Sequence, residues 1–560
     1  MEPARNPMPI GIEDFKELIA KNYYFVDKTC LIKELQQTSG KVTLFTRPRR
    51  FGKTLALSML YYFFTMDHAA ENRKLFCGLA IEQAGETYMK EQGTRPVIFL
   101  TLKELQYKTY DLLLEGFREL LRSLYGDFRL LAESPKLAED EQQFFCRILS
   151  KRANHSEMRT ALKNLMQFLE QFYNKKPVLL LDEYDAPILF ARQHGYYQEC
   201  IDFLRGFLGA ALKSNRHLDF AILTGVARIS KESIFSGLNN LDVCSVLSNS
   251  YAECFGFTQD DVEKLMQDSG VSDKLPELKQ WYDGYRFGQT EIYNPWSVIN
   301  FVKNGCQFRP YWLNTSGNSI LKELLEKVDK RRKTDLQGLL CGKSIKTPIT
   351  ENMVYDDIPK NRDALFMMLM TTGYLKPVKI WKDEENTEWV SLKIPNAEVR
   401  TAYRREILNH IAPTQGELLL HDMLASMADG DAVGFSENLS DILRDFVSFY
   451  DTAQPESFYH GLLLGFAVLM EGRYRVESNR ESGYGRFDIA FFPKNASSPG
   501  IILEIKSVKS DDELRDSAQK ALQQIRKNAY ISEFSRQDVK DIWQYGISFH
   551  GKKVYLERSE

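Results

Sequence analysis

The stretch KVTLFTRPRRFGKTLALSML, residues 41–60, predicts a strand, a loop and a helix in direct succession. Val42–Thr46 is a short apolar run of the kind that is buried on both faces in a parallel sheet. Arg47–Thr54 is a polar loop that ends in Gly-Lys-Thr, and a helical pattern follows it. Helix N-terminal amides and the ammonium of Lys53 would hold phosphates, and the hydroxyl of Thr54 would ligate Mg²⁺. The stretch therefore predicts a phosphate-binding loop.

A second apolar run, Val178–Leu181, carries two acids at its carboxyl end. Asp182 follows the predicted strand directly and can orient a Mg²⁺ shell if this strand lies beside the strand of the phosphate loop. Glu183 comes next and can activate a water molecule. An acid pair at a helix N-terminus is the common alternative for such residues. Together with the loop, the pair predicts an ATP site with Mg²⁺ shared between Thr54 and Asp182.

Further candidate ATP contacts follow from chain position. Thr224 ends a third predicted strand, Phe220–Thr224, and is a candidate sensor of the γ-phosphate. Arg228 follows closely and is either a charge-stabilising residue or a partner of Glu232. Arg47 stands where a standard phosphate loop has its first glycine, which leaves open how tightly the β-phosphate is wrapped. The loop adds four more candidate contacts, which are Arg49, Arg50, Phe51 and Gly52.

The first half of the chain alternates between predicted strands and helices, which favours a three-layer α/β domain over residues 1–257. The next region, 258–412, is helix-rich with aromatic loops, and we expect a helical or winged-helix-like fold there. Its basic run, Lys330–Lys333, is more simply a solvated helix face than a nucleic-acid patch. The other elements predicted in the first half are the strand Val97–Thr101 and the helices Thr54–Phe64, Leu105–Tyr125, Thr160–Tyr173 and Tyr197–Lys213.

The last region, 413–560, reads as an α/β block whose two central strands carry charged residues. Side chains at alternate positions of a strand share one face, so Glu504 and Lys506 project together. Asp488 reaches the same side if its strand pairs with theirs. Two carboxylates and an ammonium suit a divalent hard cation and a polarised water, which points to phosphodiester cleavage. A charge pair on an edge strand is the structural alternative. The predicted elements here are strands over Tyr474–Ser478, Arg486–Phe492, Ile501–Lys506, Ile542–Phe549 and Lys553–Glu557, and a helix over Asp511–Asn528.

The composition limits the classes of protein that the chain can belong to. Its 560 residues are too many for one core, so two to four domains are expected. A net charge of −3 gives no global basic field, so any nucleic-acid contact comes from local patches. The eight cysteines are scattered without a C-x-x-C pair, which argues against a zinc ribbon and a disulfide framework. No signal peptide or membrane span is evident, so we expect a cytoplasmic protein.

Seven segments resemble the AAA-ATPase-like domain, which occurs widely in anaerobic bacteria joined to a PD-(D/E)xK nuclease domain. They are YFVDKT (24–29), RPRRFGKT (47–54), LLLDEYDAPI (179–188), LTGVARISKESIFSGLNNL (223–241), WYDGYRFG (281–288), IYNPWSVINF (292–301) and YWLNTSGN (311–318). The resemblance extends from about Pro9 to Val554, and it makes Arg47 a typical residue of the loop rather than an anomaly.

The resemblance also implies roles in the C-terminal domain. Asp488 and Glu504 would bind Mg²⁺ with the carbonyl of Ile505 as a further ligand, and Lys506 would position or deprotonate the attacking water. His460 is expected to be a packing or capping residue. The accessory candidates are Asp27 and Lys28 in the first segment, Glu456 ahead of the nuclease motif and Gln524 on the helix after it.

These observations predict an ATP-dependent or ATP-regulated nuclease. It would join a P-loop NTPase domain with a parallel sheet, a helical middle segment that relays the nucleotide state, and a C-terminal restriction-endonuclease-like α/β domain. ATP and Mg²⁺ are the expected cofactors, and nucleic acid, DNA rather than RNA, is the expected partner. A homo-oligomer is expected because many P-loop ATPases complete their sites in trans, and a role in phage defence or mobile-element biology follows only by analogy. The alternative is a nucleotide-switched module that binds nucleic acid or protein without cleavage.

Overall fold

The structure is a computed structural model, and most of the chain is described by it. The described residues are 6–38, 40–226, 235, 241–312, 335–336, 338–340, 342–349, 361–403, 416–446, 459–460, 462–463, 466–467, 470, 473–478, 481–482, 485–495, 497–527, 534, 539 and 541–559. Arg228, Glu456 and the basic run Lys330–Lys333 lie outside them.

The chain divides into two compact units. The first contains Met1–Gly317 and Lys346–Glu398, and the second contains Asn318–Ile345 and Val399–Glu560. The N-terminal sheet therefore belongs to one unit with the described residues of 258–312 and 346–398.

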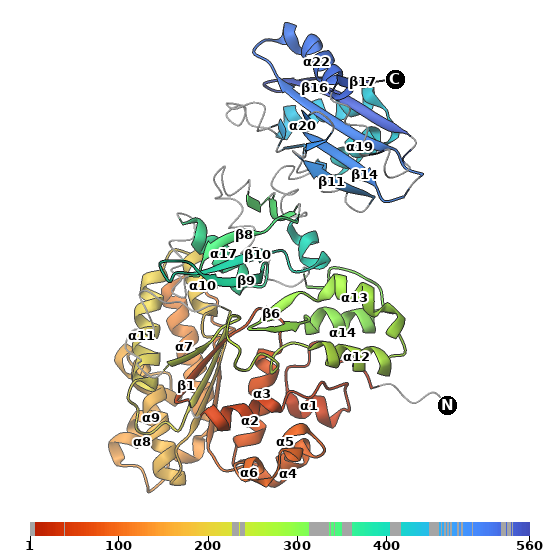
Figure 1. The fold of residues 1–560 in the computed structure, drawn as a ribbon. Coiled ribbons are helices and arrows are strands. Elements are labelled where there is room, and N and C mark those ends of the chain that lie inside the picture. The colour runs from red at the N-terminus through yellow and green to blue at the C-terminus, as the bar shows by residue number, and fades with distance from the viewer. Residues whose placement is uncertain are drawn as a thin grey trace. The chain divides into compact units, whose positions relative to one another are not determined.

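A five-stranded parallel sheet forms the centre of the first unit (Figure 1). Its strand order is β2-β3-β4-β1-β5, and the strands are β1 Val42–Thr46, β2 Val97–Thr101, β3 Val178–Asp182, β4 Ala221–Gly225 and β5 Leu241–Cys244. The first four confirm the predicted strands within one residue. The fifth, LDVC, was not predicted, because it is short and only half-buried and so lacks a clear apolar run.

Helices cover both faces of this sheet, as expected for a three-layer α/β domain. Figure 1 shows α7 Tyr110–Asp127, α8 Glu139–Leu149, α9 His155–Tyr173 and α11 Tyr197–Leu212 gathered on one side, with α3 Lys53–Phe64 on the other. The predicted helices are confirmed in place, although α7 begins five residues later and α9 five residues earlier than expected. Asn154 caps α9 by accepting a hydrogen bond from the backbone of Glu157, and Thr109 caps α7 in the same way.

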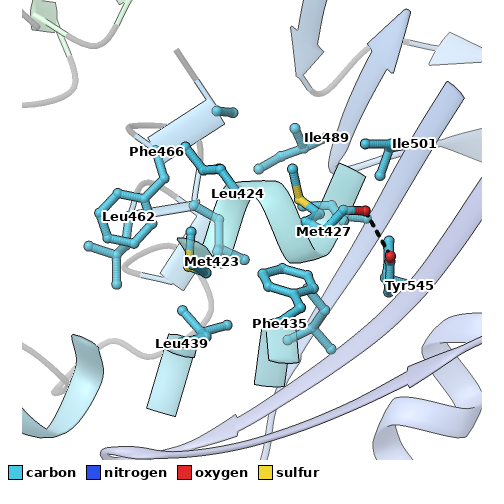
Figure 2. Close-up of a cluster of buried hydrophobic side chains, with 14 of the residues drawn as sticks. Met423, Leu424, Met427, Phe435, Leu439, Leu462, Phe466, Ile489, Ile501 and Tyr545 are labelled. Carbon is cyan, nitrogen blue, oxygen red and sulfur yellow. Dashed lines mark hydrogen bonds between the residues drawn. The ribbon is translucent and has the colours of Figure 1, made fainter. Parts of the chain in front are cut away.

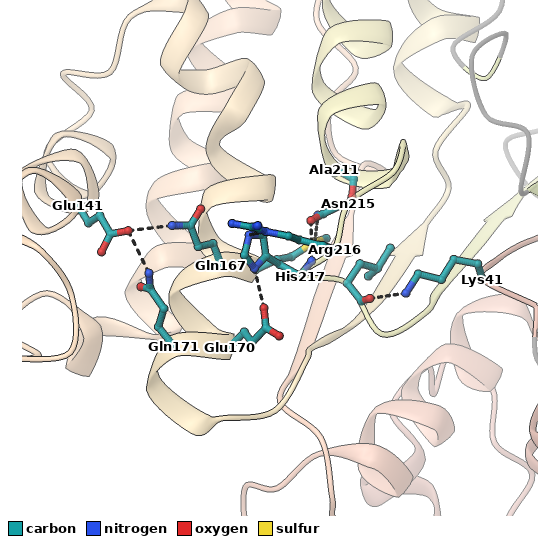
Figure 3. Close-up of polar contacts among 11 residues, drawn as sticks. Lys41, Glu141, Gln167, Glu170, Gln171, Ala211, Asn215, Arg216 and His217 are labelled. Carbon is teal, nitrogen blue, oxygen red and sulfur yellow. Dashed lines mark hydrogen bonds and ion pairs between the residues drawn. The ribbon is translucent and has the colours of Figure 1, made fainter.

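The amino-terminal edge of the sheet is fixed by polar contacts (Figure 3). Lys41, just before β1, donates from Nζ to the carbonyl of Leu218, just before β4. His217 in the same turn lies 2.6 Å from Glu170 of α9, measured from Nδ1 to Oε2. The bond between Lys41 and Leu218 holds the starts of β1 and β4 together at one edge. Because these two strands are parallel, their carboxyl ends meet at the opposite edge.

The region after Thr258 is only partly helical. Its helices include α12 Gln259–Asp268, α13 Leu275–Tyr282, α14 Pro295–Lys303 and α17 Arg362–Thr371. It also contains a hairpin of β6 Tyr285–Phe287 and β7 Thr290–Ile292, and a sheet of β8 Ile345–Pro348, β10 Glu388–Lys393 and β9 Lys376–Lys382. The expected helical middle segment is confirmed, and it also contains strands that the sequence pattern did not place. Gly284 and Gly288, both with positive φ, flank β6 and permit the tight turns that a helical pattern would exclude.

The second unit is built on a mixed five-stranded sheet in the order β11-β14-β15-β16-β17. β14 pairs antiparallel with β15, and β15 pairs parallel with β16. The strands are β11 Tyr474–Ser478, β14 Ile489–Pro493, β15 Gly500–Ser507, β16 Ile542–His550 and β17 Lys553–Arg558. All five predicted strands are confirmed, but the one predicted over Arg486–Phe492 begins only after Asp488.

Two apolar clusters cover the two faces of this sheet. On one face, Leu503 and Ile505 pack with α19 Gly416–Asp429 and α20 Ala432–Phe446, and Tyr545 donates from Oη to the carbonyl of Met427 at 2.8 Å (Figure 2). On the other face, Ile502 packs with α22 Leu514–Lys527. This alternation puts Glu504 and Lys506 on the α22 face, as the strand periodicity predicted.

Among the described residues, no helix has both the length and the apolar character needed to cross a membrane.

Candidate active sites

The phosphate loop connects β1 to α3 at the carboxyl edge of the sheet. Gly52, the residue before α3, has a φ of 81°, and Arg50 has a φ of 70°. Glycine adopts this left-handed conformation without steric cost, which explains why it precedes the helix. The turn aims the unbonded amides of the first turn of α3 at the space inside the loop.

Lys53 is folded back onto the loop. Its Nζ donates to the carbonyls of Arg47 at 3.0 Å and Pro48 at 2.9 Å. Burial lowers the pKa of this ammonium, whereas the nearby carboxylates of Glu183 and Asp182 act in the opposite direction. The side chain is thus a buried cation facing acids at the carboxyl edge of the sheet, where a phosphate group would be an alternative partner to the two carbonyls.

Thr54 and Asp182, the two expected Mg²⁺ ligands of the ATP site, are brought together. Thr54 Oγ1 donates to Asp182 Oδ2 at 2.7 Å. The strand of Asp182 was expected beside β1, but β4 lies between the two strands. Thr224 at the end of β4 fills the gap and donates its hydroxyl to Asp182 Oδ1. In this structure the candidate phosphate sensor therefore orients the carboxylate.

Glu183 has a φ of 49°, a left-handed conformation that is uncommon for a residue with a side chain. Its backbone N–H donates to Thr224 Oγ1 at 3.3 Å. Burial raises the pKa of Glu183, with Asp182 and Asp185 adding to the shift and Lys53 opposing it. Asp185, by contrast, is committed to the backbone and accepts from Val226 N–H at 2.8 Å. Glu183 is therefore the better placed of the two acids to act on a water molecule.

Arg47 is fully buried, with 0% of its surface exposed. Its guanidinium donates to the carbonyls of Cys244 at 2.7 Å and Tyr251 at 3.4 Å. It also lies 5.4 Å from the ring centre of Phe255 and 4.7 Å from that of Phe287. Burial lowers its pKa to about 10, so it remains charged at neutral pH. Arg47, which stands in place of the first glycine, thus anchors the start of the loop to the backbone at Cys244 and Tyr251.

The three residues after Pro48 contact the region that follows the sheet. The carbonyl of Arg49 accepts from Trp312 Nε1 at 3.4 Å, and the guanidinium of Arg50 lies 4.3 Å from the ring centre of Trp296. Phe51 is buried against β6, with its ring 5.4 Å from that of Phe287. The side chain of Phe51 therefore packs in the protein, although its position in the loop made it a candidate ATP contact.

Two further charged residues of the first unit were missed from the sequence, Lys103 near Glu183 and Glu398 in the region after the sheet. Lys103 follows β2 and pairs with Glu13 at 3.1 Å. Burial lowers the pKa of Lys103, but the bond with Glu13 and the nearby Glu183 outweigh this effect and raise the pKa above its usual value. Glu398 is fully buried, accepts from Trp312 N–H at 2.7 Å, and has its pKa raised to about 8 by burial. The position of Lys103 two residues after a predicted strand was a usable signal, whereas Glu398 follows no strand or motif that marks it.

The accessory candidates of the first segment have structural partners. Asp27 accepts from the N–H groups of Thr29 at 2.9 Å and Ala80 at 2.6 Å, so it fixes a turn. Lys28 donates to the carbonyl of Glu253 at 2.9 Å and pairs with Asp261. Both residues join parts of the first unit.

The C-terminal candidates meet where β14 begins beside β15. Asp488 Oδ2 accepts from the N–H of Ile505 at 2.7 Å. Lys506 Nζ donates to Glu504 Oε1 at 2.9 Å. The pairing of Ile489 with Leu503 puts Asp488 opposite Glu504, as the prediction required. The two carboxylates and the ammonium therefore come together from two neighbouring strands.

Glu504 has an unusual electrostatic position. It is 1% exposed, and its Oε2 is buried without a hydrogen-bond partner among the described residues. Burial raises its pKa to about 7, the nearby Asp488 adds to the shift, and Lys506 opposes it. Within the described part of the chain, no group of three or more His, Cys, Asp or Glu side chains is placed to hold a metal ion. Two carboxylates nevertheless fit Mg²⁺, which keeps several of its waters, and the free Oε2 is an available ligand atom.

Neighbouring residues close the site on the α22 side. A Cβ on Gly546, the partner of Glu504 on β16, would lie 2.2 Å from the carbonyl of Ala518, so only glycine lets α22 pack this closely. Gln524 lies half-buried on the same helix. His460 contacts the carbonyl of Asp488 through Nε2 at 3.1 Å.

Comparison with known proteins agrees with the two expected kinds of domain. Residues 9–235 match the family model described as "Predicted AAA-ATPase", and residues 454–559 match the model of the PD-(D/E)XK nuclease superfamily. The chain is 26% identical over 540 residues to a protein of Azotobacter chroococcum mcd 1 described as "Uncharacterized protein in vnfD 5'region", with 95% of this chain and 94% of that protein covered. The chain therefore joins a domain of the AAA-ATPase-like family to a domain of the PD-(D/E)XK nuclease superfamily.

Proposed function

We propose that this chain is a nuclease that hydrolyses nucleic-acid phosphodiester bonds with Mg²⁺ under the control of ATP. The observation that carries the proposal is the buried carboxylate of Glu504, whose Oε2 has no hydrogen-bond partner in the described part of the chain although Asp488 and Lys506 are beside it. A buried ionisable group with an unused oxygen is costly unless a cation or a proton joins it.

The proposed roles in cleavage follow from these positions. Asp488 and Glu504 hold the cation from two adjacent strands, and the N–H of Ile505 keeps the Asp488 carboxylate turned toward the site. A divalent cation held there supplies positive charge to the scissile phosphate and activates a water nucleophile. Lys506 brings an ammonium to the same face, where it orients the water and stabilises the charge that develops on the phosphate.

The proposed roles at the ATP site rest on the phosphate loop. Thr54 and Asp182 are already in contact and would share the Mg²⁺ that accompanies ATP. Lys53 would exchange the carbonyls of Arg47 and Pro48 for phosphate oxygens, because a charge-assisted bond to an anion is stronger. Glu183 would position the attacking water.

The region after the sheet is the proposed reader of the nucleotide state. Arg49, Arg50 and Phe51 each contact an aromatic residue of that region, so a shift of the loop reaches Trp312, Trp296 and Phe287 directly. These contacts support regulation by ATP rather than an ATP site that is independent of the rest of the unit.

The test is a cleavage assay on mixed single- and double-stranded DNA and RNA. Each substrate is incubated with Mg²⁺ or EDTA, and without nucleotide, with ATP or with a non-hydrolysable ATP analogue. We expect cleavage that requires Mg²⁺ and changes with nucleotide, that is lost in Asp488→Ala, and that no longer responds to ATP in Lys53→Ala. If nothing is cut but ATP alters nucleic-acid binding, the nucleotide-switched binding module replaces the nuclease.

A further inference from the structure

Two cysteines that are far apart in the sequence are in contact. The Sγ atoms of Cys30 and Cys254 lie 3.6 Å apart. The scattered spacing of the cysteines predicted no pair, and the cysteines that the structure describes are all reduced. The contact lies outside both candidate active sites, so neither proposed reaction accounts for it.

One face of a helix holds this contact in place. Cys30, Glu34 and Thr38 lie on the same side of α2 Cys30–Thr38, since they are spaced by four residues. The carboxylate of Glu34 accepts from Tyr251 N–H at 3.0 Å and lies 3.4 Å from Cys254 Sγ. The hydroxyls of Thr38 and Tyr251 are also bonded. The helix therefore binds the segment 251–254 at three successive turns.

The two thiols have different environments. Cys30 is half-buried, and its bond with Cys254 and the charge of Lys28 lower the pKa of its thiol. Cys254 is buried, and the same bond together with burial raises its pKa well above the usual value. A more acidic, more accessible thiol next to a buried one is the arrangement of an attacking and a resolving cysteine.

The segment that contains Cys254 also supports the phosphate loop. The carbonyl of Tyr251 accepts from Arg47, and the ring of Phe255 lies against the same guanidinium. The N–H of Gly256 donates to the carbonyl of Phe51 at 3.3 Å. A movement of residues 251–256 is therefore passed to both ends of the loop, at Arg47 and at Phe51.

We propose that Cys30 and Cys254 form a redox-reactive dithiol that a peroxide converts to a disulfide, and that this disulfide weakens ATP binding at the phosphate loop. The thiolate of Cys30 attacks a peroxide oxygen and the O–O bond breaks. Cys30 becomes a sulfenic acid, and the other oxygen leaves as water after taking the proton that Cys30 had released. The Cys254 thiol then attacks the Cys30 sulfur. The S–S bond forms, the S–O bond breaks, and a second water carries away the Cys254 proton. Two electrons pass from the thiols to hydrogen peroxide.

The geometry gives the disulfide its effect. The sulfurs of a disulfide lie about 2 Å apart, so oxidation draws the segment 251–256 and α2 together from their present contact. Arg47 and Phe51 are both buried, and protein interiors are close-packed, so a movement of this segment changes their present contacts.

The first measurement identifies the bond. The full-length protein is treated with one to five equivalents of hydrogen peroxide, the remaining thiols are blocked, and the peptides are mapped by mass spectrometry. We expect a peptide that joins Cys30 to Cys254, loss of two thiols, reversal by dithiothreitol, and no such peptide in Cys30→Ser. Cys77 and Cys146 are exposed and serve as internal controls. Oxidation of these controls before any Cys30–Cys254 peptide appears would overturn the proposal.

The second measurement tests the effect on ATP and rests on the proposed ATP site. A fluorescent ATP analogue is titrated into reduced and oxidised protein, with Cys30→Ser and Cys77→Ser treated in parallel. We expect the affinity to fall at least threefold on oxidation of the wild type and of Cys77→Ser, and to stay constant in Cys30→Ser. A mapped disulfide with unchanged affinity refutes the regulatory effect. Reduced protein that binds no ATP refutes the ATP site instead, which the peptide map does not depend on.

Discussion

Thr54 Oγ1 lies 2.7 Å from Asp182 Oδ2, although the two residues are 128 positions apart and their elements are separated by β4. The contact joins the first turn of α3 to the carboxyl end of β3. Thr224 holds the other oxygen of the same carboxylate. A site whose ligands are fixed by such bonds before the cation arrives needs little rearrangement to bind it.

Replacement of Lys53 tests the phosphate loop most directly. Lys53→Ala removes a charge-assisted contact worth about 1.5–3 kcal/mol, so ATP should bind roughly 10- to 150-fold more weakly. Isothermal titration with ATP and Mg²⁺ measures this. Lys74→Ala, an exposed lysine, is the matched control and should bind ATP as the wild type does. Unchanged affinity in Lys53→Ala would remove ATP from this loop.

Glu183 should be needed for ATP turnover and not for ATP binding. Glu183→Gln keeps the size of the side chain but cannot take a proton, so hydrolysis should slow at least ~10²-fold at an unchanged Kd. Phosphate release under saturating ATP measures the rate. Asp185→Asn is the comparison, and its expected effect is a lower Tm, because Asp185 holds the backbone of Val226. Wild-type turnover in Glu183→Gln would transfer the role to another acid.

Arg47 should contribute more to stability than its place in a phosphate loop suggests. Arg47→Lys keeps the charge but loses the planar group that bonds three carbonyls and lies near the rings of Phe255 and Phe287. We expect the first unit to lose about 1–3 kcal/mol and the Tm to fall by several degrees. The control is the exposed Arg122→Lys, which should melt as the wild type does. Equal Tm values for both variants would show that the guanidinium geometry is not needed.

The sequence was sufficient to predict the elements with strong local patterns. Apolar runs placed β1 to β4, and the two-residue period placed Glu504 and Lys506 on one face. Local patterns could not show that Thr224 orients Asp182, because strand order is set by packing between distant segments. The burial of Arg47 was hidden for the same reason: its partners, Cys244 and Tyr251, lie about 200 residues further along the chain.

Glu398 predicts a specific pH dependence of stability. Burial raises its pKa from 4.5 to about 8, so the folded protein keeps a proton that the unfolded chain releases in this interval. Because the folded state binds more protons between these values, stability should fall as pH rises from about 4.5 to 8. Between pH 6 and pH 8.5, the Tm of the wild type should therefore fall relative to that of Glu398→Gln. The corresponding loss in the free energy of unfolding is up to a few kcal/mol. The exposed Glu388→Gln is the control and should follow the wild type. Parallel curves for the wild type and Glu398→Gln would exclude the buried carboxyl as the cause.

The proposed nuclease site predicts different losses for its three charged residues. Asp488→Ala and Glu504→Ala each leave Mg²⁺ with one protein carboxylate, so both should lose metal binding and cleavage together. Lys506→Ala keeps both carboxylates but removes the ammonium beside Glu504, a loss of about 3 kcal/mol or ~10² in rate with metal affinity retained.

Mn²⁺ titration followed by electron paramagnetic resonance measures binding, and cleavage of labelled nucleic acid measures the rate. Lys509→Ala, an exposed lysine three residues away, is the control and should cut as the wild type does. Because Glu504 is buried, the Tm of Glu504→Ala is measured as well, and it separates loss of metal from loss of structure. If Asp488→Ala cuts as well as the wild type, the two strands do not carry a nuclease of this type.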